Sequence, residues 1–329
     1  MLTTPIMYPR SGLMPPIQRV ARLLQILCLC VFVFISQRGT PLFAQAGSHA
    51  TPLEIHNGLT FVQVMINGKG PFRFIVDTGT GGDALVSPEL VAKLGLTSVG
   101  ETEAGDPSGL NPQKVLVYEL ASLKVAGLEF TKILVTGHEP GPREGASDGV
   151  LGFRLFRDYL FTLDYPAKQL ILSKGELTSD DQKSVLPFIM PDSIPLIELQ
   201  VENKRICAHI DSGGAGLSLP EDFVRDIRFV SDPVVIGRGR TVSNDFVIKG
   251  ARLASDIQIA GYTLSHPFIE INSVLPDANF GAIPLRHFAV TFDQKNKLVR
   301  FVSKDRIVTI SSPPRGAAPG QYDEPPSAP

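Results

Sequence analysis

The feature that most constrains the fold is an internal repeat built around two short acidic triplets. Asp77-Thr78-Gly79 ends an apolar, strand-like run, and Asp211-Ser212-Gly213 ends a second such run. Before each run lies another strand-like segment, 61–66 in the first case and 196–201 in the second, followed by a tight turn. The two triplets are too far apart for a solenoid repeat, so we expect two duplicated lobes.

Later landmarks recur in the same order. An apolar segment with glycine lies at 148–152 and again at 279–283. Short helices are predicted after the triplets, at 88–94 and 220–224, because proline and acidic residues suit a helix N-terminus. Two further aspartates that end strands, Asp164 and Asp293, are interpreted as turn residues.

Composition supports a β-rich reading. Glycine and proline supply 30 and 27 of the 329 residues, which is typical of a protein with many turns. We therefore predict a mostly β fold of two duplicated β-barrel lobes with short helices. The expected divisions are a signal peptide at 1–46, an N-terminal lead-in at 47–58, lobe 1 at 59–172, a linker at 173–193, lobe 2 at 194–303, and a strand end with a disordered C-terminal tail at 304–329.

The N-terminal segment has the layout of a secretory signal. Arg19 and Arg22 precede the apolar run 26–35, and Ala44-Gln45-Ala46 provides a small-residue cleavage site. The run is too short to span a bilayer comfortably. We expect an exported protein, periplasmic or secreted, and the alternative is an uncleaved N-terminal membrane anchor.

Charge and residue usage exclude several function classes. The formal net charge is −2 and no basic cluster interrupts the chain, so nucleic acid is not an expected partner. The six histidines show no metal-ligand spacing, and Cys207 is the only cysteine left after signal cleavage. We expect no metal, no cofactor and no disulfide framework.

The paired triplets in this setting resemble the aspartic peptidases, specifically bacterial proteins with two tandem retropepsin-like lobes in a pepsin-like arrangement. The resemblance covers about residues 59–303 and rests on four segments: 75–79, 148–152, 209–213 and 279–283. It implies a bilobal acid-protease fold, a polypeptide substrate, and a monomer, because the duplication already supplies both halves of the site. In that family the apolar-glycine segment packs beneath the triplet loop.

The resemblance makes Asp77 and Asp211 the catalytic pair. Two carboxylates a few ångströms apart cannot both ionise, so they share a proton and supply a general base and a general acid together. Gly79 and Gly213 would allow the tight turns that aim the two carboxylates. The hydroxyls of Thr78 and Ser212 would cross-link the two loops, and Thr80 would bond a catalytic carboxylate.

The sequence departs from the family pattern in three places. Gly214 stands where the second lobe would carry the hydroxyl of Thr80, and a lost donor raises a carboxylate pKa, which predicts an optimum less acid than pepsin's. His209 stands where an aliphatic residue is usual, and both a packed neutral ring and a charged imidazole remain open. The candidate flaps contain Gly105 and Gly109 in lobe 1, and Gly237 and Gly239 in lobe 2, but no tyrosine; Tyr118 lies on the following strand.

These patterns predict an aspartic endopeptidase that hydrolyses peptide bonds in exported or extracytoplasmic polypeptides. The alternative is a non-catalytic peptide- or polymer-binding module on the same fold, and a weaker one is a scaffold in an envelope assembly. A lone triplet would be read as a turn, since Asp-Thr-Gly is also good turn chemistry. Substitution of either aspartate separates the possibilities, because an enzyme would lose turnover and a binding module would not.

Overall fold

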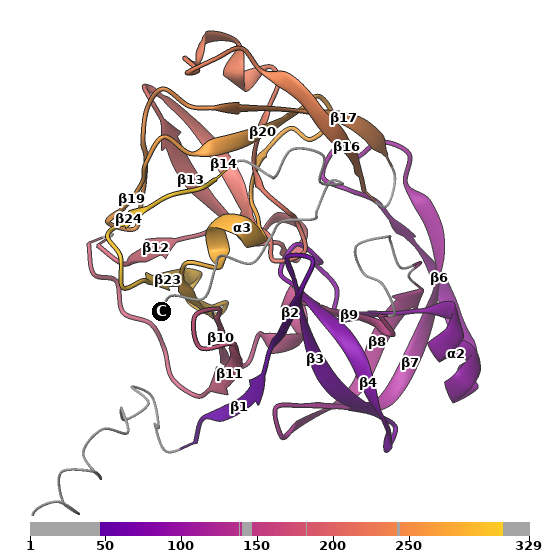
Figure 1. Ribbon diagram of the computed structural model, residues 1–329. Helices are drawn as coiled ribbons and strands as arrows, with labels where there is room; N and C mark the ends of the chain where they lie inside the picture. The colour runs from indigo at the N-terminus through magenta and orange to yellow at the C-terminus, as the bar shows by residue number, and fades with distance from the viewer. Residues whose placement is uncertain (1–46, 138, 140–146, 182, 242–243, 312–329) are drawn as a thin grey trace, which may run out of the picture. The chain divides into compact units, whose positions relative to one another are not determined.

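Short strands joined by tight turns make up most of the chain, and the prediction of a mostly β, bilobal fold is confirmed. The computed structural model describes residues 47–137, 139, 147–181, 183–241 and 244–311 (Figure 1). The predicted signal peptide and the tail from 312 onward lie outside the described residues. No helix among the residues described is both long and apolar enough to cross a membrane.

The first lobe is built on an eight-stranded sheet. Its strands are β2 Glu54–His56, β3 Leu59–Ile66, β4 Lys69–Asp77, β5 Ala84–Val86, β6 Ser98–Ala104, β7 Gln113–Val125, β8 Leu128–Gly137 and β9 Gly149–Gly152. They follow the order β2-β3-β4-β9-β5-β8-β7-β6, and β3 also pairs with β7. The hairpin of β3 and β4 turns at Asn67 and Gly68, both with positive φ, as the Asn-Gly signal predicts.

The second lobe repeats this topology in a ten-stranded sheet. Its strands are β13 Leu196–Val201, β14 Lys204–Ile210, β15 Leu217–Pro220, β16 Val234–Arg240, β17 Asp245–Arg252, β18 Ile257–Ile259, β19 Tyr262–Leu264, β20 Phe268–Asn272, β21 Ala278–Phe280 and β24 Ile307–Val308. Their order is β24-β19-β18-β13-β14-β21-β15-β20-β17-β16. From β13 to β16 it matches β3 to β6 strand for strand, and β14–β21 is parallel as β4–β9 is.

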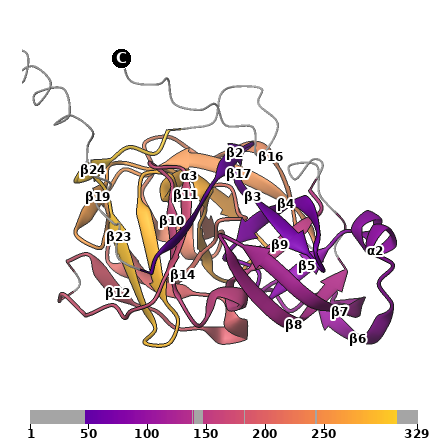
Figure 2. The same ribbon diagram turned by 90° about the horizontal axis from the view of Figure 1, so that it is seen from below.

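A third sheet joins the two halves of the molecule. Its strands are β1 His49–Pro52, β10 Leu160–Asp164, β11 Gln169–Ser173, β12 Val185–Pro187, β22 Ala289–Asp293 and β23 Leu298–Val302. Its strand order is β1-β11-β10-β22-β23-β12 (Figure 2). Thr162 of β10 is paired with Thr291 of β22, and their hydroxyls are 2.9 Å apart. The segments expected as lead-in and linker thus supply strands β1, β2 and β12.

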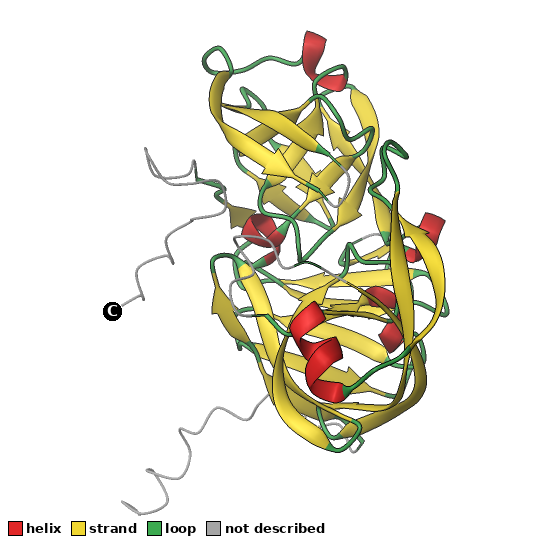
Figure 3. Cartoon of the chain, turned by 90° about the vertical axis from the view of Figure 1, so that its right-hand side faces the viewer, coloured by secondary structure: helices red, strands yellow, loops and turns green. Residues whose placement is uncertain are grey.

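Helices are few and short (Figure 3). The helix expected at 88–94 is confirmed as α2 Pro88–Leu94, where the Ser87 hydroxyl accepts the N–H of Leu90 at 3.2 Å. The second predicted helix is wrong in its bounds: Pro220 closes β15, and a 3₁₀ turn follows at η3 Phe223–Asp226. The others are η1 Phe153–Phe156, η2 Pro191–Ser193 and α3 Ala282–Leu285.

Phenylalanine side chains fill the space between the third sheet and the first lobe. Phe153 of η1 lies edge-on to Phe292 of β22, with ring centroids 5.0 Å apart. Phe161 of β10 stacks on Phe156 and on Phe292, and all four rings are buried. Aromatic contacts therefore connect residues from both halves of the repeat.

Candidate active site

A reciprocal pair of hydrogen bonds locks the two triplet loops together. The Thr78 hydroxyl accepts the N–H of Ser212 at 2.9 Å and donates to the Ile210 carbonyl at 2.6 Å. The Ser212 hydroxyl accepts the N–H of Thr78 at 3.0 Å and donates to the Val76 carbonyl at 2.8 Å. Both hydroxyl residues are fully buried, so the interactions are shielded from water. The geometry is the loop cross-link that the resemblance implied.

This lock places the two aspartates face to face. A Cβ added to Gly79 would lie 2.5 Å from Oδ1 of Asp211, and one added to Gly213 would lie 2.6 Å from Oδ1 of Asp77. Each triplet glycine therefore leaves room for the carboxylate of the opposite lobe, and any larger residue would collide with it. The structure thus brings together two residues that lie 134 positions apart in the chain.

The environment of Asp77 favours its protonated form. Burial is the main cause that raises the pKa of Asp77, and the charge of Asp211 and a hydrogen bond with it raise the pKa further. The Thr80 hydroxyl at 2.8 Å from Oδ2 and the Gly79 N–H at 2.7 Å from Oδ1 act in the opposite direction. The net effect is a raised pKa, as expected where two carboxylates share a proton.

The apolar-glycine segments support the loops from below. In lobe 1 the N–H of Phe153 donates to the Thr80 carbonyl at 2.8 Å. In lobe 2 the N–H of Ala282 donates to the Gly214 carbonyl at 2.9 Å. A Cβ on Gly152 or Gly281 would collide with the backbone of the loop above it, so both positions need glycine.

Asp83 is a supporting residue that the sequence reasoning missed. It is buried, and its Oδ1 accepts hydrogen bonds from Nε of Arg154 at 2.9 Å and from Nη1 of Arg157 at 3.0 Å. Its carbonyl accepts the N–H of Gly152 at 3.0 Å. Asp83 thereby fixes the end of the loop that carries Thr80. No local motif marks these contacts, because the arginines lie 71 and 74 residues away.

Tyr165 is a second residue that the motif search passed over. It follows Asp164, whose carboxylate accepts the N–H of Ala167 at 2.9 Å, in agreement with a turn role. The Tyr165 side chain is buried, and burial raises the pKa of its hydroxyl. The negative charges of Asp211 and Asp77 raise that pKa further, which places the hydroxyl within electrostatic reach of the pair.

The candidate flaps are the β6–β7 and β16–β17 hairpins. Gly105 and Gly109 lie in the turn between β6 and β7, where the sequence predicts them. The prediction for lobe 2 is displaced: Gly237 and Gly239 lie inside β16, and the turn begins only at Thr241. A Cβ on Gly239 would meet the Phe246 ring at 2.6 Å, so this glycine makes room for an aromatic side chain.

The tips of these two hairpins are hydrogen-bonded to each other. Nδ2 of Asn244 donates to Oδ2 of Asp106 at 2.9 Å, and Thr241 donates to the same oxygen. Nδ2 of Asn111 donates to Oδ1 of Asn244 at 2.9 Å. Burial alone would raise the pKa of Asp106, but hydrogen bonds from Ser108, Thr241 and Asn244 lower it to about 2. We call Asp106, Asn111, Thr241 and Asn244 the tip latch.

Tyr118 and His209, which the sequence patterns also single out, both have side chains packed inside the protein. Tyr118 is buried in the core of lobe 1 and lies on β7, away from the hairpin turn. His209 is largely buried, and its Nε2 lies 3.6 Å from Oδ2 of Asp277. In the part of the chain that the structure describes, no cluster of three or more His, Cys, Asp or Glu has the arrangement of a metal site.

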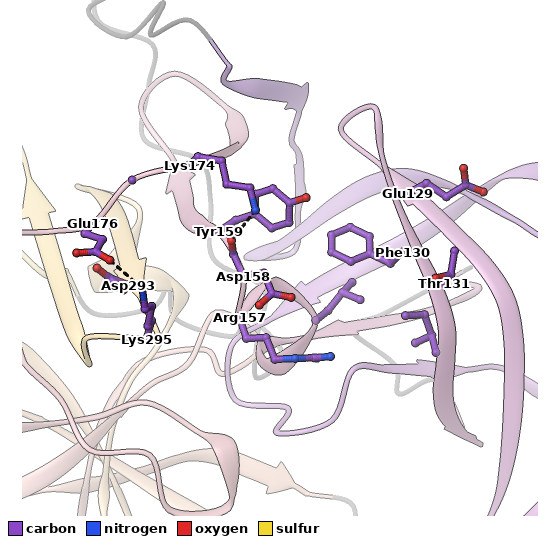
Figure 4. Close-up of a pocket in the computed structure, with 13 residues that line it drawn as sticks. Glu129, Phe130, Thr131, Arg157, Asp158, Tyr159, Lys174, Glu176, Asp293 and Lys295 are labelled. Atoms are coloured by element: carbon purple, nitrogen blue, oxygen red, sulfur yellow. Dashed lines mark hydrogen bonds and ion pairs between the residues drawn. The ribbon is translucent and has the colours of Figure 1, made fainter.

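A pocket with a volume of about 730 Å³ does not contain the aspartate pair (Figure 4). It lies where β8 meets the segments around Tyr159, Lys174 and Lys295. Its cations have partners already: Nζ of Lys174 donates to the Asp158 carbonyl at 3.1 Å, and Lys295 pairs with Glu176 at 2.9 Å. The candidate site is therefore identified by the geometry of the triplet loops and not by this pocket.

Comparison with known proteins agrees with part of this reading. Residues 62–155 match a family described as aspartyl protease. The match runs from β3 to η1, includes Asp77, and stops before Asp211. Comparison with the curated proteins gives no match. The first lobe thus contains an aspartyl protease-like domain, and assignment of the second lobe depends on the repeated topology and on the interlocked loops.

Proposed function

We propose that the protein is an aspartic endopeptidase that hydrolyses peptide bonds in exported or extracytoplasmic polypeptides. The observation that supports this most strongly is the partly buried pair of Asp77 and Asp211, held face to face by the reciprocal bonds of the fully buried Thr78 and Ser212. Fold alone would not carry the proposal, because the same fold can host other functions. The paired carboxylates supply the chemistry.

The proposed reaction uses one proton shared by the pair. The ionised carboxylate accepts a proton from a water molecule, whose oxygen attacks the peptide carbonyl carbon. The protonated carboxyl gives its proton to the carbonyl oxygen, which leaves a tetrahedral gem-diol intermediate. Its C–N bond then breaks, the departing nitrogen takes the proton that the first carboxylate accepted from water, and one gem-diol hydroxyl returns its proton to the other carboxylate as the product acid forms. The raised pKa of Asp77 favours the state in which one proton stays on the pair near neutral pH.

Cleavage of an unfolded protein tests the proposal. Residues 47–329, which form one compact unit, are incubated with reduced and alkylated lysozyme from pH 3 to pH 8, beside Asp77→Asn and Asp211→Asn. We expect wild-type cleavage that both variants abolish. Cleavage that survives in either variant overturns the proposal. Binding of the substrate without cleavage at any pH also overturns it, and supports the binding module.

The exported context needs its own test, because it depends on the N-terminal segment 1–46. The full chain is expressed in a Gram-negative host, and the protein is recovered separately from periplasm and cytoplasm. We expect periplasmic protein that begins at Gly47. Recovery of the uncleaved chain in the membrane fraction would favour the anchor, and recovery in the cytoplasm would contradict export.

A further inference from the structure

The two aspartate loops differ just after their triplets. In lobe 1 the Thr80 hydroxyl donates to Oδ2 of Asp77 at 2.8 Å. In lobe 2 the equivalent residue is Gly214, and Oδ1 of Asp211 accepts both backbone N–H groups, from Gly213 at 2.9 Å and from Gly214 at 2.8 Å. The loop therefore presents its donors to one oxygen of Asp211 and offers no hydroxyl to the other, Oδ2.

Asn279 approaches Oδ2 of Asp211, the oxygen to which the loop offers no hydroxyl. A Cβ added to Gly214 would lie closer than 3.0 Å to Nδ2 of Asn279 and also to Oδ2 of Asp211. The amide nitrogen and the carboxylate oxygen thus border the same space, about the size of one carbon atom. Only glycine at position 214 leaves that space open for the two groups.

The equivalent strands of lobe 1 show which residue occupies the position of Asn279 there. Asn279 of β21 is in register with His209 of β14, whereas in lobe 1 Val150 of β9 is in register with Ile75 of β4. Ile75 and Val150 belong to a buried apolar cluster with Leu59 and Phe61. Lobe 1 therefore combines a hydroxyl in the loop with a valine beneath it, and lobe 2 combines a glycine in the loop with an asparagine beneath it.

We propose that Asn279 is a positioning residue for Asp211. The side-chain amide of Asn279 takes the place of the hydroxyl that Thr80 supplies to Asp77. The role in catalysis rests on the proposed function, but the geometry does not. The amide is a neutral donor. The titratable groups nearby are Asp77 across the pair, His209 on the neighbouring strand with Asp277 beyond it, Glu270, which lies against Gly216, and Tyr165, whose hydroxyl is within electrostatic reach of the pair.

This inference changes the expectation drawn from Gly214 alone. A glycine there removes a hydroxyl donor, which by itself would move the pH optimum upward. On this proposal the ionised form of the pair has a donor on each side, namely the Thr80 hydroxyl on Asp77 and the Asn279 amide, which borders the same space as Oδ2 of Asp211. We therefore expect the pH dependence to respond strongly to position 279, although this residue lies on a strand outside both triplets.

The first test compares two substitutions that differ in charge. Asn279→Val removes the donor, and Asn279→Asp keeps the shape but puts a carboxylate against Asp211. We expect the pH–rate profile to move to higher pH by about half a unit to one unit in Asn279→Val, and by more in Asn279→Asp. Asn203→Asp, which adds the same charge at an exposed turn of lobe 2, should leave the profile unchanged. Unmoved profiles in both Asn279 variants overturn the inference.

The second test exchanges the pair of residues together. Gly214→Thr alone should reduce activity at least tenfold, because its Cβ collides with the amide of Asn279 and with Oδ2 of Asp211. Gly214→Thr combined with Asn279→Val removes the first collision and recreates the lobe 1 combination, so it should be more active than Gly214→Thr alone and have a pH profile closer to that of the wild type. Additive losses in the double variant contradict the proposed coupling, since independent positions add.

A titration without substrate separates this inference from the proposed function. Carboxyl ¹³C signals of aspartate-labelled protein are followed with pH in wild type, Asn279→Val and Asn203→Asp. An inactive wild type in which the dyad titration moves upward in Asn279→Val alone refutes the peptidase but supports the role of Asn279. An active wild type whose dyad titration is the same in all three proteins refutes the role of Asn279 and leaves the peptidase intact.

Discussion

The hydroxyl of Ser212 bonds two backbone groups from one buried position. It accepts the N–H of Thr78, donates to the Val76 carbonyl and orients the loop that carries Asp211. The Val76 carbonyl has a second donor, the Thr60 hydroxyl at 3.2 Å, but the N–H of Thr78 depends on Ser212. A buried N–H without a partner is the main cost of losing this side chain.

Ser212→Ala should therefore destabilise the protein by about 1–3 kcal/mol. Ser212→Thr, which copies the residue used at Thr78 in lobe 1, keeps the hydroxyl and should cost less. Thermal unfolding measures both, and peptide cleavage should fall much more in the alanine variant because the carboxylates lose their fixed orientation. Equal unfolding temperatures for wild type and Ser212→Ala would contradict the role assigned to this hydroxyl.

Asp77 makes the stability of the fold depend on pH. Its pKa is raised in the folded protein, so the folded state binds a proton more tightly than the unfolded state. Stability from this group is complete below the ordinary aspartate value, near 4, and is lost as the pH rises through the raised pKa. Each unit of the difference corresponds to about 1.4 kcal/mol.

Asp77→Asn cannot ionise, so it avoids this loss. We expect its unfolding temperature to rise relative to wild type as the pH increases from about 4 to 8, by several degrees at the upper end. Differential scanning calorimetry across this range measures the difference. The control is Asp158→Asn, because Asp158 is exposed, and its difference should stay flat. If the difference in unfolding temperature between Asp77→Asn and wild type does not change with pH, the pKa of Asp77 is not raised in the folded protein.

At the scale of elements, the tip latch connects hairpins from different lobes. The carboxylate of Asp106 accepts hydrogen bonds from Thr241 and Asn244 of the opposite hairpin. Its pKa is lowered to about 2, so the latch is complete above the ordinary aspartate value and is lost only as the pH falls through about 2. Mild acid therefore leaves the latch closed.

We expect the latch to restrict the entry of a polypeptide chain. Asp106→Ala removes hydrogen bonds to a charged group, which are worth about 1.5–3 kcal/mol each, less at this partly exposed site. The variant should cleave a protein substrate several-fold faster in kcat/KM, with similar gains at pH 4 and pH 7. Ser98→Ala is the control, since Ser98 bonds only within its own hairpin. A slower Asp106→Ala would mean that the latch helps to hold substrate.

Many of the individual turns, helices and loops can be predicted from the sequence, for physical reasons. Local signals such as Asn67-Gly68 and the proline before α2 act within a few residues and predict their elements correctly. The paired triplets predict the aspartates because duplication places equivalent loops together. The prediction that Gly239 lies in a flap turn is wrong, because its small size makes room for the Phe246 ring inside a strand.

The remainder depends on contacts between distant segments. The bonds of Asp83 to Arg154 and of Asp106 to Asn244 join residues 71 and 138 positions apart, and neither pair has a local pattern. In the sequence, Asn279 is only one residue of the apolar segment with glycine at 279–283. Its role beside Asp211 is indicated by its register with His209 and by the space above Gly214. Such residues become visible only when the strands are paired.

At the scale of the whole molecule, the third sheet makes the two lobes one folding unit. Three strands of the first half, β1, β11 and β10, lie beside β22 and β23 of the second, and β10 pairs with β22 at the centre of the sheet. Residues expected as a linker supply β12, which pairs with β23. A chain cut in this linker would have to reassemble a sheet, so we do not expect either lobe to fold alone.

Phe292 provides the sharpest test of this cooperativity. Its buried ring, which belongs to the second half of the repeat, contacts Phe153 of η1 and Phe161 of β10 in the first half, and also Phe188. Phe292→Ala should destabilise the protein by about 3–5 kcal/mol through lost burial and the cavity that remains. We expect calorimetry to show one transition at lower temperature, because loosening the shared core weakens both lobes together. Val302→Ala, at an exposed position of the neighbouring strand β23, controls for substitution in this sheet. Two separate transitions in Phe292→Ala, with one at the wild-type temperature, would show instead that a lobe is stable without the shared sheet.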